Sequence, residues 1–567
     1  MNPDTLKSIS LRSIVEYTLR TVYAIEREER RLVKHEPVIV DELEFHENTK
    51  SMISEARIIL TNTPLTSIDD YMELVIKEFC TDIFHSPNEP SFMNVRYAIL
   101  LDIIPVNRMS TFSDDWIDSR WRSLWVELFY KKWAECSNPD ELKLKKLSLS
   151  ATPMTSMGSS NFYKMFENFT HLTSLKIFPD NSWRFGLPRN IWQYENSFFN
   201  HIIRAISQYC RELRELHLAY DGEALKNTGL KIEDLVKCRN LVSLWLYDQS
   251  PMTAVKSVDG LQKLLIELKN LKCLYHKNLK SAILDLNEKI SGTLGLEHLI
   301  LRDDNQDVEL VLTTDELVRL SKICPATRTL KLIKPPPCID TVARVLPNLE
   351  ILDMSECDAD LLSSLSRALF QKNLKNLEVL KLRGVFNLNY THISQLAHHC
   401  PNLEVLDISF ATIKADGDLT LPPRQSSAFP HLKKLTMVPK CDMIGPWHIC
   451  YIGNNGGCRY SMWEVGEKLT RYLLKGSYNL ESLHIHYCDS YYKPSSSFVP
   501  EMLESLNNLT SLQLVSFLDM PCEFIDKIAT YCPKLNKLAA LGSWGECNMT
   551  HHEKSSVHIE LKSRCEC

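Results

Sequence analysis

The stretch that decides the fold runs from His392 to Ile408 and reads HISQLAHHCPNLEVLDI. Its first half spaces apolar residues at i, i+3, i+4 and i+7, from Ile393 to Cys400, as one face of a helix does. Its second half carries the pattern Leu-x-x-Leu-x-Leu from Leu403 onward, with isoleucine at the last position. The last three residues of that pattern alternate as in a β-strand, so their two apolar side chains point to the same face. The stretch therefore predicts a helix followed directly by a strand.

The strand pattern recurs along the chain with substitutions at some positions. Its first residue falls at Leu144, Leu172, Leu213, Leu241, Leu271, Leu296, Thr327, Leu349, Leu377, Leu403, Leu432, Leu480, Leu509 and Leu535. Eleven of the thirteen steps between these fourteen positions span 22 to 31 residues, which is close to the period of leucine-rich repeats. A single helix and strand cannot bury their apolar faces alone, so neighbouring repeats must stack. The sequence predicts an α/β fold, a curved parallel solenoid with strands inside and helices outside.

Three segments carry a closer resemblance. CPNLEVLDI (Cys400 to Ile408), CPATRTLKL (Cys324 to Leu332) and CPKLNKLAA (Cys532 to Ala540) resemble the cysteine-containing subclass of leucine-rich repeats. The resemblance covers roughly residues 140 to 545 and implies a leucine-rich-repeat horseshoe. The subclass is common in F-box proteins, the substrate receptors of cullin-RING ubiquitin ligases, and in related receptors that use Elongin C. It thus implies a protein substrate, and Elongin C or an F-box adaptor plus a cullin, as partners.

The repeat also explains most of the cysteines. Five of them stand just ahead of the strand pattern, at the expected corner between helix and strand: Cys210, Cys238, Cys324, Cys400 and Cys532. A small apolar side chain fits such a corner, so we expect buried structural thiols there.

The chain divides into three parts. Residues 1 to 138 lack the repeat and are expected to be mainly helical, residues 139 to 545 form the solenoid, and residues 546 to 567 form a polar C-terminal tail. The two long steps between repeats are insertions, at 179 to 200 and at 438 to 465, and both are rich in aromatic residues. Aromatic-rich insertions of this length favour packing or binding.

A candidate partner surface follows from the strand pattern. The residue between the last two apolar positions of each strand points to the inner, concave face of a solenoid. On neighbouring repeats these positions hold aromatic residues, with Trp245 as the largest, and exposed Trp, Tyr and Arg dominate interface energy. The predicted partner-binding residues are His217, Trp245, Tyr247, Tyr275, Ile300 and Arg302. The alternative is that an insertion or the N-terminal region folds over them.

The first residues contain a candidate adaptor site. Thr5 to Ile14 (TLKSISLRSI) resembles the Elongin C-binding box, in which a Ser/Thr-Leu pair is followed by a cysteine and then an aliphatic residue, four positions apart each time. Ser10 replaces the cysteine. A frame shifted to Ser10, with Val15 at the cysteine slot and Leu19 at the end, fits equally well. The predicted adaptor-binding residues near 5 to 22 are Leu6, Ile9, Leu11 and Ile14.

Two other interpretations of the N-terminal region stay open. Pro64-Leu65 is a poor match to the Leu-Pro pair of an F-box. The region could also act as a plain end cap of the solenoid.

Composition restricts the classes of function. Of the 567 residues, 44% are hydrophobic and 24% charged, which is typical of globular proteins. The net charge of −6 argues against nucleic acid or an anionic membrane as the main partner. The N-terminus has no apolar signal segment, and the longest apolar run, from Tyr97 to Val106, is too short for a membrane span. We expect a cytoplasmic or nuclear protein.

No catalytic pattern is present. The sequence has no Walker loop, no dinucleotide fingerprint and no His-Glu-x-x-His. Cys441, His448, Cys450 and Cys458 are too irregularly spaced for a zinc site, and so are the Cys and His residues between Cys547 and Cys567. We predict a chain that is not an enzyme and binds no metal or cofactor. The leading hypothesis is the substrate-recognition subunit of a cullin-RING ubiquitin ligase, and the alternative is a leucine-rich-repeat scaffold or regulator without a ligase.

Overall fold

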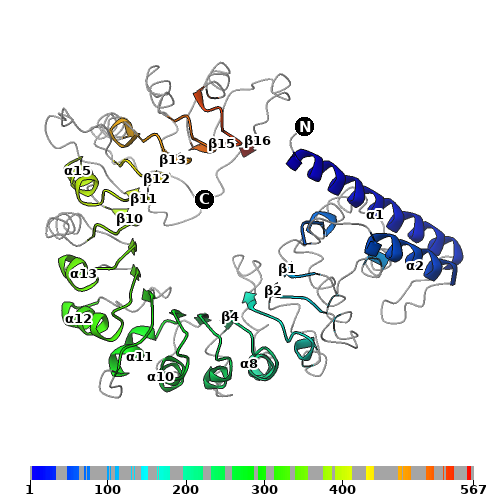
Figure 1. Cartoon of the computed structure of the whole chain (residues 1–567), viewed down its shortest axis with the longest axis horizontal. Helices are drawn as coiled ribbons and strands as arrows, with labels where there is room; N and C mark the ends of the chain where they lie inside the picture. Colours follow the sequence, from blue (N-terminus) through cyan, green and yellow to red (C-terminus); the bar gives the residue numbers. More distant parts are fainter. Residues whose placement is uncertain are drawn as a thin grey trace, which may run out of the picture. The chain divides into compact units, whose positions relative to one another are not determined.

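The structure is a computed structural model of the whole chain (Figure 1). It describes residues 3–33, 47–62, 69–71, 73–76, 99–100, 103, 109–113, 129, 133, 142–150, 163, 165–178, 196–220, 232–248, 258–286, 292–301, 312–332, 339–354, 374–385, 390–410, 429–439, 470–474, 477–486, 506–515, 528, 531–541 and 558–562. The chain forms two compact units, Met1–Ala282 and Ile283–Cys567.

The first unit contains the N-terminal helices and six parallel strands in sequence order. The strands are β1 (Thr111–Ser113), β2 (Lys146–Ser150), β3 (Ser174–Phe178), β4 (Glu215–Tyr220), β5 (Ser243–Asp248) and β6 (Cys273–Tyr275). The helices are α1 (Pro3–Val33), α2 (Glu47–Asn62), α8 (Asn196–Tyr209), the 3-10 helix η7 (Ile232–Lys237) and α10 (Val258–Glu267). Helix α11 (Leu279–Leu286) spans the boundary between the two units.

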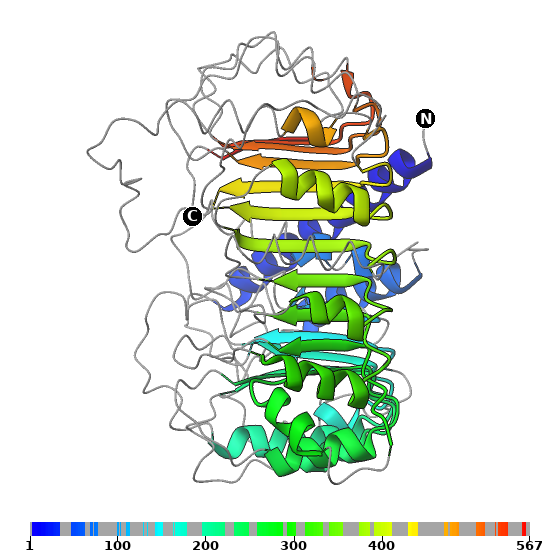
Figure 2. The same ribbon diagram turned by 90° about the vertical axis from the view of Figure 1, so that its left-hand side faces the viewer.

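The second unit repeats the same arrangement with ten parallel strands (Figure 2). They are β7 (His298–Leu301), β8 (Thr329–Leu332), β9 (Ile351–Met354), β10 (Val379–Val385), β11 (Val405–Phe410), β12 (Lys434–Pro439), β13 (Ser482–His486), β14 (Ser511–Val515), β15 (Lys537–Leu541) and β16 (His558–Lys562). Its helices are α12 (Thr314–Ile323), α13 (Ile339–Val345) and α15 (Tyr390–His399). Figure 2 shows the strands stacked with their arrows pointing the same way and the helices along one face of the sheet.

The predicted fold class, an α/β leucine-rich-repeat solenoid, is confirmed. Each of the fourteen motif positions is followed by a strand, from β2 to β15. The motif leucines align in register from strand to strand, as Leu380, Leu406 and Leu435 do on β10, β11 and β12, and all three are fully buried. The helix predicted in the deciding stretch is α15, and Ile393 and Leu396 on its apolar face are buried.

The sheet is one strand longer at each end than the motif predicts. Strand β1 lies within the N-terminal region and pairs with β2, aligning Phe112 with Leu147. Strand β16 lies in the segment assigned to a polar tail and pairs with β15, aligning Ile559 with Leu538. Strand β16 has Ile559 and Leu561 at the last two apolar positions of the motif, whereas at β1 these positions hold Phe112 and Asp114; neither strand has a leucine at the first position. The boundaries at 138 and 546 therefore underestimate the extent of the sheet.

A carbonyl ladder links the repeats just before each strand. In the first unit the carbonyl of Ser110 accepts hydrogen bonds from the backbone N–H groups of Lys145 (2.8 Å) and Lys146 (3.0 Å), and the same two-to-one arrangement recurs at β3, β4, β5 and β6. At β1 no described residue of an earlier repeat supplies such a carbonyl. Oδ1 of Asp69 takes its place and accepts from the N–H groups of Ser110 (3.0 Å) and Thr111 (3.1 Å). A side chain from the N-terminal region thus completes the first strand.

Aromatic side chains fill the core where the N-terminal region meets the first strands. Phe112, Phe129, Trp133 and Phe169 are fully buried, and their ring centroids lie 4.5 to 5.4 Å apart in tilted and edge-on pairs. Such pairs add to the energy of burial. Trp116, Trp121 and Trp125, which lie between Phe112 and Phe129 in the sequence, are outside the described residues.

The five corner cysteines are buried free thiols, as predicted. Burial raises the pKa of the Cys238, Cys324 and Cys400 thiols to about 12, and that of Cys532 to about 11. A thiol that stays protonated is a poor nucleophile, so these side chains pack rather than react.

No helix in the described part of the chain is both long enough and apolar enough to cross a membrane.

Candidate functional site

The first unit carries a row of stacked rings on the open face of its sheet. His217, Trp245 and Tyr275 occupy the same register position on β4, β5 and β6. Trp245 stacks on His217 (centroids 5.3 Å apart, planes at 14°) and on Tyr275 (5.2 Å, 27°). Tyr247 lies beside this line, 5.0 Å from Tyr275 and 6.1 Å from Phe178. We call these five residues the aromatic row.

The rings are less exposed than the sequence suggests. Trp245 and Tyr247 are half-buried, whereas His217 and Tyr275 keep only 9% and 6% of their surface exposed. The physical reason lies in the register: rings on neighbouring strands cover each other's faces. Trp245, Tyr247 and Phe178 can therefore contact a partner, whereas His217 and Tyr275 pack against these rings and support them.

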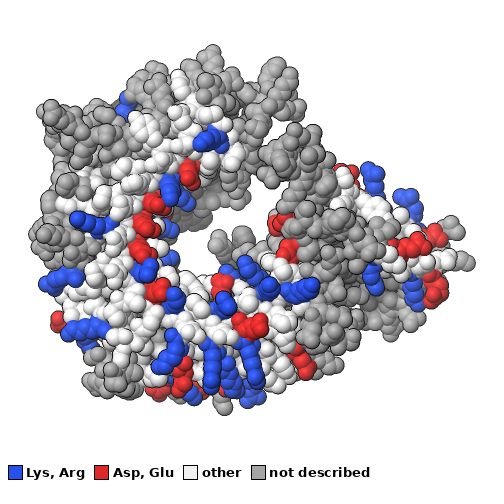
Figure 3. All heavy atoms as spheres, viewed as in Figure 1, with Lys and Arg blue, Asp and Glu red and all other residues white. Residues whose placement is uncertain are grey.

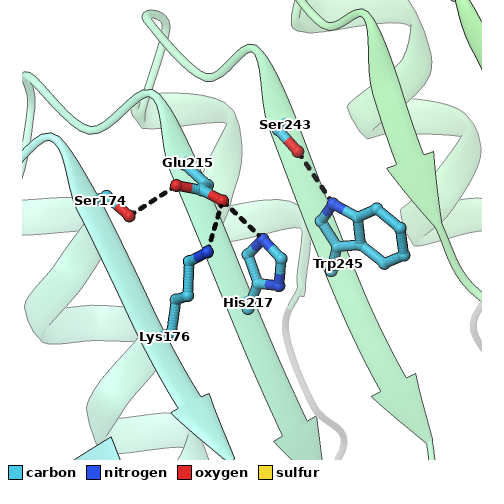
Figure 4. Close-up of polar contacts among 6 residues, drawn as sticks. All are labelled: Ser174, Lys176, Glu215, His217, Ser243 and Trp245. Atoms are coloured by element: carbon cyan, nitrogen blue, oxygen red, sulfur yellow. Dashed lines mark hydrogen bonds and ion pairs between the residues drawn. The ribbon is translucent and has the colours of Figure 1, made fainter. Parts of the chain in front are cut away.

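A polar network holds one end of the aromatic row (Figure 4). The carboxylate of Glu215 accepts a hydrogen bond from the Ser174 hydroxyl (2.6 Å) and meets Nζ of Lys176 (2.9 Å) and Nε2 of His217 (2.9 Å). On the next strand Nε1 of Trp245 donates to the Ser243 hydroxyl (2.9 Å). These contacts fix the orientation of the imidazole and the indole before any partner arrives.

The network sets the charge of its members. Desolvation acts to raise the pKa of Glu215, but hydrogen bonds from Ser174 and Lys176 and the charges of Lys176 and His217 outweigh it and lower that pKa. Desolvation, assisted by the Lys176 charge, lowers the pKa of His217, and Glu215 offsets this only in part. At neutral pH the stacked imidazole is therefore neutral. Nδ1 of His217 is buried and has no hydrogen-bond partner among the described residues.

The other two predicted surface residues behave differently. Ile300 lies on β7 in the second unit and is only 5% exposed, so it offers no contact surface. The aromatic row belongs wholly to the first unit. Arg302 lies outside the described residues.

Helix α1 contains the candidate adaptor box. The helix is continuous from Pro3, so positions 6, 10 and 14, four residues apart, share one of its faces. The side chains of Leu6, Ile9 and Leu11 lie outside the described residues, and Ile14 is half-buried.

The shifted frame of the box is disfavoured by packing. Val15 and Leu19 are 2% and 8% exposed and belong to the core of the N-terminal region. Thr18, between them, shares a hydrogen bond with the Tyr71 hydroxyl (2.8 Å). Side chains committed to the chain's own core cannot also enter an adaptor groove. The F-box candidate at Pro64-Leu65 lies outside the described residues.

The described part of the chain shows no candidate metal site. No three His, Cys, Asp or Glu side chains converge there as ligands of a metal ion. The cysteines and histidines of the 438 to 465 insertion lie outside the described residues. The expectation that the chain is not an enzyme stays a prediction.

Sequence reasoning missed five members of the site: Phe178 and the network residues Ser174, Lys176, Glu215 and Ser243. Phe178 joins the rings because its strand, β3, is next to β4 in the sheet. Glu215 joins because Ser174 occupies the same register position on β3. Both could be found by aligning the strand patterns column by column.

Comparisons with known proteins add the following. No protein-family model matches the chain, and no curated protein does. A solved structure described as the Rad7 and Elc1 complex in yeast matches with 12% identity and a TM-score of 0.33, over 90% of this chain and 94% of that one. The leucine-rich-repeat-containing protein LegL7 from Legionella pneumophila matches with 18% identity and a TM-score of 0.29, over 54% of this chain and 88% of that one. These values are too low to bear on function; the strands and their register define the chain as a leucine-rich-repeat protein.

Proposed function

We propose that the chain is a receptor that holds a protein partner on the aromatic row. The observation that carries this proposal is the half-exposed pair Trp245 and Tyr247, fixed by ring stacking and by the Ser243 hydrogen bond. Large rings that are already ordered lose little conformational entropy on binding, and such residues dominate interface energy. Of the six predicted residues, His217 and Tyr275 serve as support rather than contact, Ile300 is buried, and Arg302 lies outside the described residues.

The finer proposal is that this receptor is the substrate-recognition subunit of a cullin-RING ubiquitin ligase. Its support is the Elongin C-binding box resemblance at Thr5 to Ile14 together with its position in a continuous helix. The packing of Val15 and Leu19 leaves the first frame as the one able to reach an adaptor. Elongin C is accordingly the adaptor that we propose, with a cullin joined through it.

Site-specific crosslinking tests the partner surface. A photoreactive residue in place of Tyr247 should crosslink a partner in cells, because this side chain is half-exposed beside Trp245. The same residue in place of Tyr478, which is 64% exposed at the corner before β13 in the second unit, provides the control. The Tyr247 product should disappear when Trp245→Ala is added. Identical products from both positions, or a product indifferent to Trp245, would show that the aromatic row is not the partner surface.

A pull-down with purified Elongin C tests the ligase proposal. Burying one leucine contributes roughly 1.5–3 kcal/mol, so Leu6→Asp plus Leu11→Asp should weaken a micromolar contact at least about 100-fold. The matched control is Ser51→Asp plus Ser54→Asp, which adds the same charge at two exposed positions of α2. Equal recovery of Elongin C and cullin with both variants would contradict the proposal. The chain would then be a scaffold or regulator without a ligase.

A further inference from the structure

Basic side chains gather at the edge of the first unit where its strands begin. Arg211, Arg239 and Lys269 occupy the same corner position in three successive repeats, and all three are exposed. Two side-chain hydrogen bonds establish this equivalence: Nδ2 of Asn240 donates to the Arg211 carbonyl (3.1 Å), and Nδ2 of Asn270 donates to the Arg239 carbonyl (3.1 Å). We call these three residues the corner row.

A second line of basic residues lies three positions further along the sequence of each repeat, closer to the sheet. Lys145, Arg214 and Lys272 each come just before a strand and are exposed. They take part in the same carbonyl ladder: the Arg214 carbonyl accepts from Val242, whose carbonyl in turn accepts from Lys272 (2.8 Å each). We call Lys145, Arg214 and Lys272 the leading row.

The corner row is not neutralised by the residues that the structure describes. Its three side chains form no ion pair with any residue that the structure describes in this unit. Neighbouring strands lie about 5 Å apart, so like charges at one position of adjacent repeats repel each other. Figure 3 shows columns of Lys and Arg side chains in the part of the chain where Figure 1 labels α8 and α10. An anionic ligand would relieve this repulsion.

The second unit shows that the repeat itself does not require basic residues here. Its corner positions include Pro325, Pro347, Lys375 and Pro401. Its leading positions from β8 to β12 hold Arg328, Glu350, Glu378, Glu404 and Lys433, where Arg328 pairs with Glu350 (2.9 Å) and Lys433 with Glu404 (2.8 Å). The corner row of basic residues is therefore a property of the first unit, which also carries the aromatic row.

We infer that the partner segment held on the aromatic row is acidic. Arg214 and Lys272 precede His217 and Tyr275 by three residues, which is about 10 Å along a strand. An extended segment can place an apolar side chain on Trp245 and Tyr247 and a run of Asp and Glu residues on the two basic rows. This inference rests on the proposed function and names the chemistry of the partner.

A protein segment fits these rows better than nucleic acid. Exposed Glu212 and Glu267 lie at the same edge as the corner row. They would oppose the evenly spaced phosphates of a nucleic-acid strand, whereas a peptide can leave neutral residues opposite them.

Three synthetic peptides of equal length and with the same apolar residues test the inference. Their remaining positions are all Glu, all Gln or all Lys, and binding to the full chain is measured by fluorescence anisotropy at low and high salt. The Glu peptide should bind at least about tenfold more tightly than the Gln peptide at low salt and lose this advantage at high salt. Arg211→Glu, Arg239→Glu and Lys269→Glu together should abolish the advantage. Lys263→Glu, Lys322→Glu and Lys375→Glu, three exposed lysines elsewhere, make the same change in net charge and should retain it.

The outcomes separate the two proposals. Equal binding of the Glu and Gln peptides, or a Glu advantage that survives reversal of the corner row, overturns the acidic segment. If such charge-independent binding is lost with Trp245→Ala, the aromatic row still stands as the partner surface. A single-stranded DNA oligonucleotide that competes at lower concentration than the Glu peptide overturns the inference in favour of nucleic acid.

Discussion

Replacing Trp245 with alanine tests how the aromatic row is built. The substitution removes three stacked pairs, with His217, Tyr247 and Tyr275. Such a pair is worth about 0.5–1.5 kcal/mol beyond area burial, but pairs that share one ring are not fully additive. The lost hydrogen bond to Ser243 adds little, because that hydroxyl is half-exposed and can bind water. We therefore expect the free energy of unfolding of the first unit to fall by about 1–3 kcal/mol.

Two variants on the same strand bracket this value. Trp245→Phe keeps a ring in the stack and removes only the N–H donor, so it should cost less than the alanine variant. Leu244→Ala empties a fully buried position and should cost about 2–5 kcal/mol. Urea unfolding followed by far-ultraviolet circular dichroism, with hydrogen exchange of β4 to β6, measures all three.

The order of the three losses in free energy of unfolding shows whether the indole belongs to the core or to the surface. A loss for Trp245→Ala as large as that for Leu244→Ala would place the indole in the core, and the partner surface would have to lie elsewhere. No loss at all would mean that the stack does not form in solution.

Two further predictions concern the core and the polar network. Leu406→Ala should lower the free energy of unfolding by about 2–5 kcal/mol and speed hydrogen exchange mainly in β10, β11 and β12, because repeats couple chiefly to their neighbours. Thr436→Ala, on the inner face, is the control. Exchange that rises equally in all strands would contradict this prediction. The pKa of His217 is lowered in the folded state. The contribution of neutral His217 to the free energy of unfolding is therefore fully present above pH 6.5, the ordinary pKa of histidine, and is lost as the pH falls below that value. Urea midpoints at about pH 7.5 and about pH 5.5 should therefore differ less for His217→Gln than for the unchanged chain, and an equal or larger difference would refute this.

The strands from β2 to β15 could be predicted from the sequence because each repeats one pattern of buried leucines. The two strands at the ends could not, because Met109 and Ser556 stand where the first leucine of the motif is expected. At β1 the missing information is tertiary, since its ladder is completed by Asp69, 41 residues before Ser110.

The candidate site was predicted only in part for a related reason. The alternation of each strand places Trp245 and Tyr247 on one face, which the sequence shows directly. How much of each ring is covered depends on the ring beside it on the next strand, as Tyr275 shows by being buried next to Trp245. Likewise, the hydrogen bond between Glu215 and Ser174 joins residues that are 41 positions apart, and it depends on the register between β3 and β4.

The carboxylate of Asp69 has a consequence for how the array assembles. Successive repeats are similar enough that a chain could join them out of step by one whole repeat. Asp69 supplies an acceptor that fits only the first strand, and it offers no N–H group from which an earlier repeat could continue. The Asp69 side chain therefore defines β1 as the first strand of the array. Its loss should increase the fraction of misaligned chains more than it lowers the stability of correctly aligned ones.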